Sequence, residues 1–363
     1  MSKLLFATHE DLEFTPVSKA MFQDVATQLS SKYGLPNRIF SASKKTESNG
    51  EFFTFARETS GKFDFSSFFS IIKAYKIFYA ALDGVDIVLF RSYPSFIVFS
   101  PLVILLGKNI IFDSRGLFFD ELVDSGKLNR RWIVLLRWVE KLLLKLSNSV
   151  ICVTKAQALF YKNTHKIKLE KLIVIPNGAK NVVVKQDMSG AKALSFCYVG
   201  SLVRWHLPFL VRDFCSELDR RGISFSLDVI TRETEKAKEI FKEVSQLKVF
   251  SHNFRESPIR YDYGFCFIGG GVSKQVCYPV KFNEYVVSGT SVIALDTVAE
   301  VNRLIRRYKL GVVLNGTSVG QLVEEFLLAR NSFSSDVNEL PYELSFDYQC
   351  ECIASLIKTT RGG

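Results

Sequence analysis

Short apolar runs of the kind that form buried strands alternate with helical patterns along most of the chain. The first set of these runs is LLFA near the start, DIVLF (86–90), NIIFD (109–113), SVICVT (149–154) and KLIVIPN (171–177). After a break, a second set comprises LSFCYVGS (194–201), FSLDVIT (225–231), GFCFIGG (264–270) and SVIAL (291–295). This alternation is typical of parallel sheets whose strands are joined by crossover helices. The sequence therefore predicts an α/β chain with two doubly wound, Rossmann-like sheets.

The break between the two sets predicts a domain boundary. Pro176-Asn177-Gly178 is a strong turn signal, and residues 181–193 have the composition of a linker. We expect a first domain over 1–185, a second over 186–345 and a final segment over 346–363 with a helical apolar pattern at 346–360. Because ligands of open α/β sheets bind beyond the carboxyl ends of the strands, two facing sheets would hold a substrate between them.

The net charge of +10 is concentrated in the first domain. Residues 1–185 contain 26 Lys and Arg against 16 Asp and Glu, whereas the rest of the chain is balanced. Such a basic half is expected to meet an extended anionic partner, either a phospholipid surface or nucleic acid. No recognised nucleic-acid-binding fingerprint is present, so nucleic acid is the less favoured partner.

A basic amphipathic helix is predicted over residues 129–149. Arg130, Arg137, Lys141 and Lys145 fall close to one helical stripe, with Trp132 and Trp138 nearby. This stripe could dock on anionic lipid headgroups. A crossover helix whose basic face meets only water has the same pattern.

Other features favour a cytoplasmic chain that does not cross a membrane and holds no metal. The seven Cys are scattered without a C-x-x-C pair, and the start MSKLLFATHEDLEF lacks a secretory pattern. The apolar run 96–107 is interrupted by Pro101 and is about half of the roughly 20 residues that a spanning helix needs. Neither D-x-D nor H-x-x-x-H occurs, so no bound metal is expected.

The run YPVKFNEYVVSGTSVIA (278–294) predicts a binding site on a loop, helix and strand. Pro279 favours a helix start whose free N–H groups attract anions, and Lys281 adds a positive charge there. Glu284, one turn later, could accept hydrogen bonds from the vicinal hydroxyls of a sugar. Gly289 would end the helix before the strand 291–295. An ordinary amphipathic helix with a solvated Lys–Glu pair is the alternative.

Two further loops follow predicted strands. Gly200-Ser201 closes the predicted strand 194–201 and would let a diphosphate approach backbone amides. Arg204 lies just beyond it, where an Arg exposed after a tight turn is the alternative to a functional role. The glycines at 269–271 form either a loop beside that pocket or a plain linker.

In the first domain, Asp113-Ser114-Arg115-Gly116 follows the strand 109–113. Arg115 could hold a phosphate or sugar oxygen while Asp113 accepts a hydroxyl proton, or the two could form a structural ion pair. Asp120 and Glu121 are expected to be helix-entry residues or acceptor-loop contacts.

These segments, taken in order, resemble the retaining glycosyltransferases of the GT-B fold, especially the bacterial family 4 group. The donor-site pattern of that group, P-x-K-x-x-E-Y-x-x-x-G-x-x-V-I, matches residues 279–293. Further similar passages are FDSRGLFFDELVDSGKL (112–128), SNSVICVTKA (147–156), VIPNGA (174–179), FCYVGSLVRWH (196–206) and YDYGFCFI (261–268). Many members carry a first Glu eight residues before the second; here that position is Val276.

The resemblance implies a hexosyltransferase that moves a sugar from a nucleotide diphosphate to a lipid-linked or polysaccharide acceptor, at the inner face of the cell membrane. It implies retention of configuration without a metal, a donor-binding second domain and a final helix that returns to the first. The implied catalytic residues are Arg204, Lys281, Glu284 and Arg115. The implied donor-binding residues are Gly200, Ser201, Arg204, Pro279, Val280, Lys281 and Glu284. The implied acceptor-binding residues are Asp113, Arg115, Gly116, Thr15, Pro16 and Ser18. A nucleotide-sugar epimerase of the same fold and a degraded nucleotide-sugar binding subunit are the alternatives.

Overall fold

The computed structural model divides into two compact units. The first unit comprises Met1–Ile175 and Gln349–Gly363, and the second comprises Pro176–Tyr348. The structure describes residues 3–12, 22–43, 52–56, 68–180, 184, 186–187, 193–251, 254, 258–330 and 340–361. The division between the units therefore falls at residue 175, before the boundary predicted at 185, and the end of the chain belongs to the first unit.

A seven-stranded parallel sheet forms the centre of the first unit, in the order β3-β2-β1-β4-β5-β6-β7. Its strands are β1 (Lys3–Asp11), β2 (Asn37–Ser43), β3 (Phe52–Ala56), β4 (Val85–Arg91), β5 (Asn109–Ser114), β6 (Ser149–Cys152) and β7 (Leu172–Val174). The central strands are buried almost throughout, as in β5, where the five residues after Asn109 are buried. Strand order reverses between β1 and β4, and such a switch point is where open α/β sheets bind ligands.

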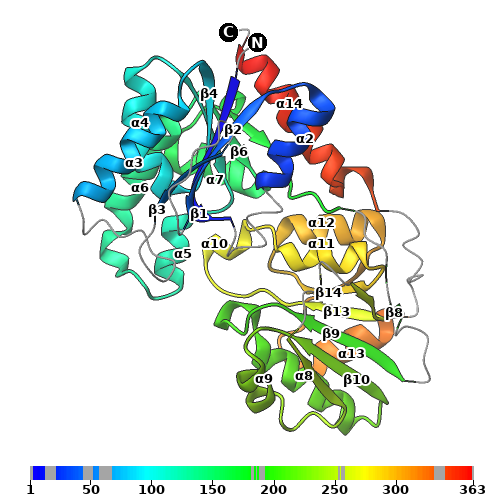
Figure 1. Cartoon of the computed structure of the whole chain (residues 1–363). Coiled ribbons are helices and arrows are strands. Elements are labelled where there is room, and N and C mark those ends of the chain that lie inside the picture. Colours follow the sequence, from blue (N-terminus) through cyan, green and yellow to red (C-terminus); the bar gives the residue numbers. More distant parts are fainter. Residues whose placement is uncertain are drawn as a thin grey trace. The chain divides into compact units, whose positions relative to one another are not determined.

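Helices cover both faces of this sheet (Figure 1). Helices α3 (Phe68–Ala81), α4 (Tyr93–Leu105) and α6 (Ile133–Leu146) lie together on the left of the sheet in Figure 1, and α2 (Asp24–Tyr33) and α14 (Phe346–Arg361) lie on the right. The unit also contains α5 (Phe118–Asp124), α7 (Lys155–His165), η2 (Arg130–Trp132) and η3 (Leu169–Lys171). Local capping fixes several ends; the Thr154 side chain, for example, accepts a hydrogen bond from the Gln157 N–H at the start of α7.

The second unit has a six-stranded parallel sheet in the order β11-β10-β9-β13-β14-β15. Its strands are β9 (Leu194–Val199), β10 (Phe225–Ile230), β11 (Leu247–Phe250), β13 (Tyr263–Cys266), β14 (Ser291–Leu295) and β15 (Gly311–Leu314). A separate pair joins β8 (Gln186–Asp187) and β12 (Ile259–Arg260). The strand order again reverses once, between β9 and β13, so both units have the same doubly wound topology.

Six helices, the first turn of α14 and two short 3₁₀ turns complete the described part of the second unit. The helices are α8 (Pro208–Arg220), α9 (Thr234–Ile240), α10 (Val272–Gln275), α11 (Val280–Val287), α12 (Ala299–Tyr308) and α13 (Val319–Ala329), with η4 (Arg204–His206) and η6 (Tyr342–Leu344) as the 3₁₀ turns. The core between sheet and helices is rich in aromatic rings, with Phe196 stacked on Phe265 at 5.4 Å between ring centres.

All nine apolar runs that predicted strands form strands, and SVIAL matches the bounds of β14. The helical pattern at 346–360 is also confirmed, since α14 spans Phe346–Arg361. The α/β prediction with two doubly wound sheets is therefore correct. The run 96–107 lies mostly in α4, which contains Pro101, and no helix in the described ranges is long and apolar enough to span a bilayer.

Candidate functional site

Two loops meet at the switch point of the second sheet. One follows β9 and covers residues 200–207, and the other follows β13 and covers 267–271. The Gly269 N–H donates to the Trp205 carbonyl across 2.9 Å, which joins the two loops. A Cβ on Gly269 would come within 2.8 Å of the Leu207 side chain, so glycine permits this close approach. Gly200, with a φ of +117°, turns the chain out of β9.

Lys281 lies at the start of α11, beside these loops. Pro279 is the N-cap residue of that helix, and Val280 and Lys281 are its first two residues. The Lys281 side chain is only 5% exposed, and its Nζ lies 4.9 Å from the centre of the Tyr198 ring. Nζ has no hydrogen-bond partner among the described residues, and burial lowers the pKa of this ammonium group. A solvated Lys–Glu pair is therefore excluded for Lys281.

Two further basic side chains lie near Lys281. His206 Nδ1 donates to the Ser201 carbonyl across 2.9 Å, which leaves Nε2 as the acceptor nitrogen of the neutral ring. Burial, and then the charge of Lys281, lower the pKa of His206 to about 4. Lys274 is buried, and its Nζ lies 4.4 Å from the centre of the Trp205 ring. This edge of the sheet can therefore receive a polyanion.

The remaining predicted donor residues surround the same edge. Glu284 is half-buried one turn beyond Lys281, and its charge favours the charged form of that ammonium. Arg204 begins η4 with an exposed side chain, and Ser201 is also exposed. Val276 is buried at the end of α10 and offers no polar side-chain group to a ligand. The ammonium group of Lys281 thus lies near a carboxylate, Glu284, that can accept hydroxyl hydrogen bonds.

In the first unit, Asp113 and Arg115 form a buried ion pair at the carboxyl end of β5. The Arg115 Nε donates to Asp113 Oδ2 across 2.8 Å, and Nη2 lies 2.7 Å from the same oxygen. Asp113 Oδ1 is buried and has no hydrogen-bond partner in the described part of the chain. One oxygen of the Asp113 carboxylate is thus engaged by Arg115, and the other is not.

The switch point of the first sheet carries polar residues that the sequence analysis did not single out. Arg91, the last residue of β4, is buried, and this burial together with the nearby charge of Arg115 lowers its pKa to about 10. Ser92 has a φ of 86°, which is uncommon for a residue with a side chain and is found at functional sites. His9 Nδ1 lies 2.6 Å from Ser92 Oγ. The position of Arg91 directly after a predicted strand was the signal that could have identified it.

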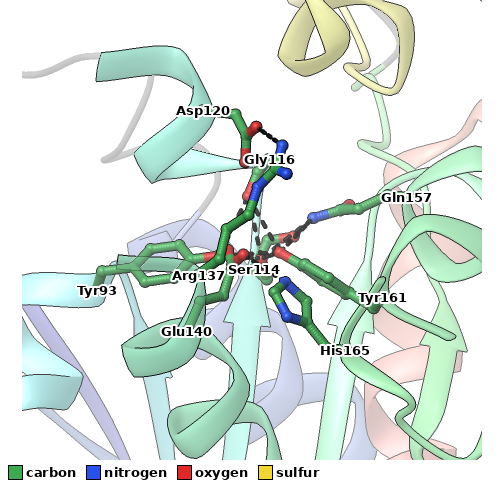
Figure 2. Close-up of polar contacts among 9 residues, drawn as sticks. All are labelled: Tyr93, Ser114, Gly116, Asp120, Arg137, Glu140, Gln157, Tyr161 and His165. Carbon is green, nitrogen blue, oxygen red and sulfur yellow. Dashed lines mark hydrogen bonds and ion pairs between the residues drawn. The ribbon is translucent and has the colours of Figure 1, made fainter. Parts of the chain in front are cut away.

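A buried polar network supports the loop that contains Arg115 and Gly116 (Figure 2). Tyr161 Oη lies 2.6 Å from Ser114 Oγ and donates to the Gly116 carbonyl across 3.3 Å. Glu140, which is fully buried, accepts hydrogen bonds from the Tyr93 hydroxyl and from His165 Nε2, the latter across 2.7 Å. Burial and the charge of Glu140 raise the pKa of both tyrosines well above the ordinary value.

The basic helix predicted over 129–149 is observed as η2 (Arg130–Trp132) followed by α6 (Ile133–Leu146), and the latter carries Arg137, Lys141 and Lys145. Arg137 is paired with Asp120 (Figure 2). Its guanidinium also lies 5.6 Å from the centre of the Phe160 ring, so this one basic group of the helix is engaged within the protein. The side chain of Arg130 is not described. Asp120 and Glu121 lie in the first turn of α5, as predicted for helix-entry residues.

Some predicted positions cannot be compared with the structure. Thr15, Pro16 and Ser18 lie outside the described residues. Sequence analysis also missed His206 and Lys274, although both adjoin predicted loops. Among the residues that the structure describes, no group of three or more His, Cys, Asp or Glu side chains is placed to hold a metal ion.

Solved structures of similar fold are glycosyltransferases and related nucleotide-sugar enzymes. Sucrose-phosphate synthase from Thermosynechococcus elongatus matches with a TM-score of 0.74 at 11% identity, covering 100% of both chains. Anabaena Alr3699/HepE in complex with UDP and glucose matches at 0.61 and 11% identity, covering 99% of this chain and 97% of that chain. A putative UDP-N-acetylglucosamine 2-epimerase from Listeria monocytogenes matches at 0.62 and 12% identity, covering 98% and 96%. No protein-family profile and no curated protein sequence matches the chain. The chain has the GT-B glycosyltransferase fold.

Proposed function

We propose that the protein is a glycosyltransferase that binds a nucleotide-diphosphate sugar at the carboxyl edge of the second sheet. The observation that carries this proposal is Lys281, a buried ammonium group at a helix start without a hydrogen-bond partner in the described structure. A diphosphate would supply the missing negative charge, and helix N-termini favour such anions. The similarity in fold to HepE, solved with UDP and glucose, supports this ligand class.

The proposed reaction retains the anomeric configuration and uses no metal. The bond from the anomeric carbon to the diphosphate oxygen breaks, and the acceptor oxygen forms a new bond on the same face. The acceptor hydroxyl proton passes to the departing diphosphate. Arg204 and Lys281 offset the charge on the leaving group, and Glu284 binds the ribose hydroxyls. Gly200, Ser201, Pro279 and Val280 complete the donor site with backbone groups.

The proposed acceptor is lipid-linked or a polysaccharide, and the transferred sugar is a hexosyl group. Asp113, Arg115 and Gly116 are the proposed acceptor contacts in the first unit. The excess of basic residues over 1–185 supports a location on the inner face of a cell membrane, because anionic lipids attract such surfaces.

Epimerisation of a nucleotide sugar is the second candidate, since the Listeria epimerase has a similar fold. Incubation of the protein with each of a panel of nucleotide sugars, with and without a membrane-lipid extract, separates the two. Transfer predicts a glycosylated lipid or glycan and free nucleoside diphosphate. An isomeric nucleotide sugar formed without acceptor would replace the transferase proposal with an epimerase.

The same assay tests the assigned residues. Glu284→Gln should lower kcat/KM about 10- to 150-fold, which corresponds to about 1.5–3 kcal/mol for a charge-assisted hydrogen bond. Arg204→Ala should reduce kcat more than it raises KM, because its proposed contact is with the leaving group. EDTA should leave turnover unchanged. If Glu284→Gln retained full turnover at limiting donor, the ribose assignment would be wrong.

A further inference from the structure

Four helices of the first unit present outward faces without an exposed carboxylate. Helices α3, α4, α6 and α7 contain one acidic residue, Glu140, and this residue is fully buried. All other Asp, Glu, Lys and Arg positions in these helices are basic: Lys73, Lys76, Arg137, Lys141, Lys145, Lys155 and Lys162. A solvated helix surface ordinarily mixes both signs of charge, so this surface is unusual.

Large apolar side chains are exposed on the same helices. They are Ile72 and Tyr79 in α3, Ile97, Ile104 and Leu105 in α4, Val134, Leu135, Trp138, Leu142 and Leu146 in α6, and Leu159 in α7. The exposed fractions of Trp138, Val134 and Leu105 are 63%, 77% and 82%. We call these exposed side chains and the lysines beside them the apolar–basic face.

Buried contacts pack these helices side by side, so their outward sides neighbour one another. Phe78 of α3 and Phe99 of α4 are 4.6 Å apart between ring centres, and Tyr93 of α4 donates a hydrogen bond to Glu140 of α6. Asn148, just after α6, donates its N–H to the carbonyl of Ile110, near the start of β5 and shortly after α4 ends. Figure 1 shows α3, α4 and α6 as neighbours on the same side of the sheet.

Helix α6 shows how the apolar and basic groups are combined. Glu140, Leu143 and Leu144 are buried on its inner side, and Trp138 and Leu142, four residues apart, lie on the opposite side. Lys145 is exposed beside them, whereas Arg137 is engaged by Asp120. The exposed side of α6 is therefore mainly apolar, with basic groups interspersed.

We propose that the apolar–basic face inserts into the headgroup region of an anionic lipid bilayer, with apolar side chains providing most of the attraction. Amphipathic helices bind bilayers in this way, and Trp favours the membrane interface. A second copy of the chain is a poorer partner, because face-to-face contact would place lysines against lysines without a carboxylate. Anionic lipids supply both the apolar phase and the opposite charge. This inference concerns the membrane partner of the proposed function, but it rests on the exposed side chains and not on the donor site.

Vesicle flotation with purified full-length protein tests the proposal without an activity readout. The probe is phosphatidylcholine vesicles, with or without phosphatidylglycerol. The test variant combines Leu135→Glu, Trp138→Glu and Leu142→Glu. The matched control combines Phe209→Glu and Leu328→Glu, which replace exposed apolar residues of the second unit. A charge variant combines Lys141→Gln and Lys145→Gln.

We expect the triple variant to bind anionic vesicles at least tenfold more weakly than the wild type, and the matched control to bind unchanged. The charge variant and high salt should each weaken binding less than the triple variant does. Two of the three Trp residues, Trp132 and Trp138, are exposed in this region, so brominated lipid should quench the fluorescence of the wild type. Equal melting temperatures of all variants would verify that they are folded.

Three results would overturn the proposal. The first is absence of vesicle binding by the wild type, and the second is equal binding by the wild type and the triple variant. The third is a wild-type dimer in analytical ultracentrifugation that the triple variant abolishes while vesicle binding is unchanged, since this would make the face a contact between copies. None of these measurements depends on nucleotide binding, so their results would stand even if the proposed donor site proved wrong.

Discussion

Six strands of the first sheet have the same order as the six strands of the second, but the buried charged residues of the two units are arranged in opposite ways. In the first unit two buried carboxylates have partners within the protein: Asp113 is paired with Arg115, and Glu140 accepts hydrogen bonds from Tyr93 and His165. In the second unit the ammonium group of Lys281 is buried without a hydrogen-bond partner among the described residues. Paired charges hold a loop in place, whereas a lone buried cation raises the free energy of the empty site until an anion arrives.

If this comparison is correct, replacing a paired buried charge should destabilise the fold. Glu140→Ala removes the acceptor for Tyr93 and His165, and we expect a loss of about 3–5 kcal/mol in the free energy of unfolding. Chemical denaturation followed by circular dichroism measures this change. Glu170→Ala, which removes an exposed carboxylate paired with Lys168 at 3.3 Å, should cost less than about 1 kcal/mol. Equal stability of the two variants would mean that the network does not hold the loop.

The next largest effect should show whether Arg115, in the first unit, contacts the acceptor and not the nucleotide. Arg115→Ala removes the partner of Asp113 and should lower kcat/KM for transfer by about 10- to 150-fold, equivalent to about 1.5–3 kcal/mol. Nucleoside diphosphate affinity, measured by calorimetry, should not change, because the proposed diphosphate site lies in the second unit. A large loss of nucleotide affinity would instead assign Arg115 to the donor.

Much of this fold could be predicted from sequence because the central strands are buried on both sides. Runs such as DIVLF and SVIAL are continuously apolar, and the corresponding strands β4 and β14 lie inside the sheets. Strands β2 and β3 were missed. Strand β2, NRIFSAS, mixes polar residues with apolar ones and lies next to the edge of the sheet, and β3 is the edge strand. Strands β11 and β15, also edge strands, were missed as well.

The candidate site was only partly predictable. Lys281 and Glu284 share a helix, so their spacing could be read from the sequence, but spacing does not reveal that Lys281 is buried. His206 lies in η4 and Lys274 in α10, two segments far apart in sequence, and the hydrogen bond between Trp205 and Gly269 joins the loops next to them. The pairing of Arg137 with Asp120 could not be predicted, because helical periodicity does not show tertiary contacts.

A smaller effect should appear in the titration of His206. Its pKa of about 4 means that it is neutral at pH 6, and a bound diphosphate would favour the imidazolium form. We expect saturating nucleoside diphosphate to raise this pKa toward the ordinary value of 6.5. Binding would then take up protons, so the affinity for the nucleotide should increase as the pH falls from 6.5 toward about 4. NMR titration is practical because the chain has only four His. An unchanged pKa would place the diphosphate away from His206.

The most direct test of the central claim is nucleoside diphosphate binding by Lys281→Met, measured by calorimetry with uridine, guanosine, adenosine and thymidine diphosphates. Met fills similar space without charge, so the melting temperature should be unchanged or higher, while affinity for the preferred nucleotide should fall at least tenfold. Lys242→Met, which removes an exposed lysine of the same unit, is the matched control and should bind like the wild type. The account would be contradicted if Lys281→Met bound as tightly as the wild type, or if it lost stability as Glu140→Ala is expected to do.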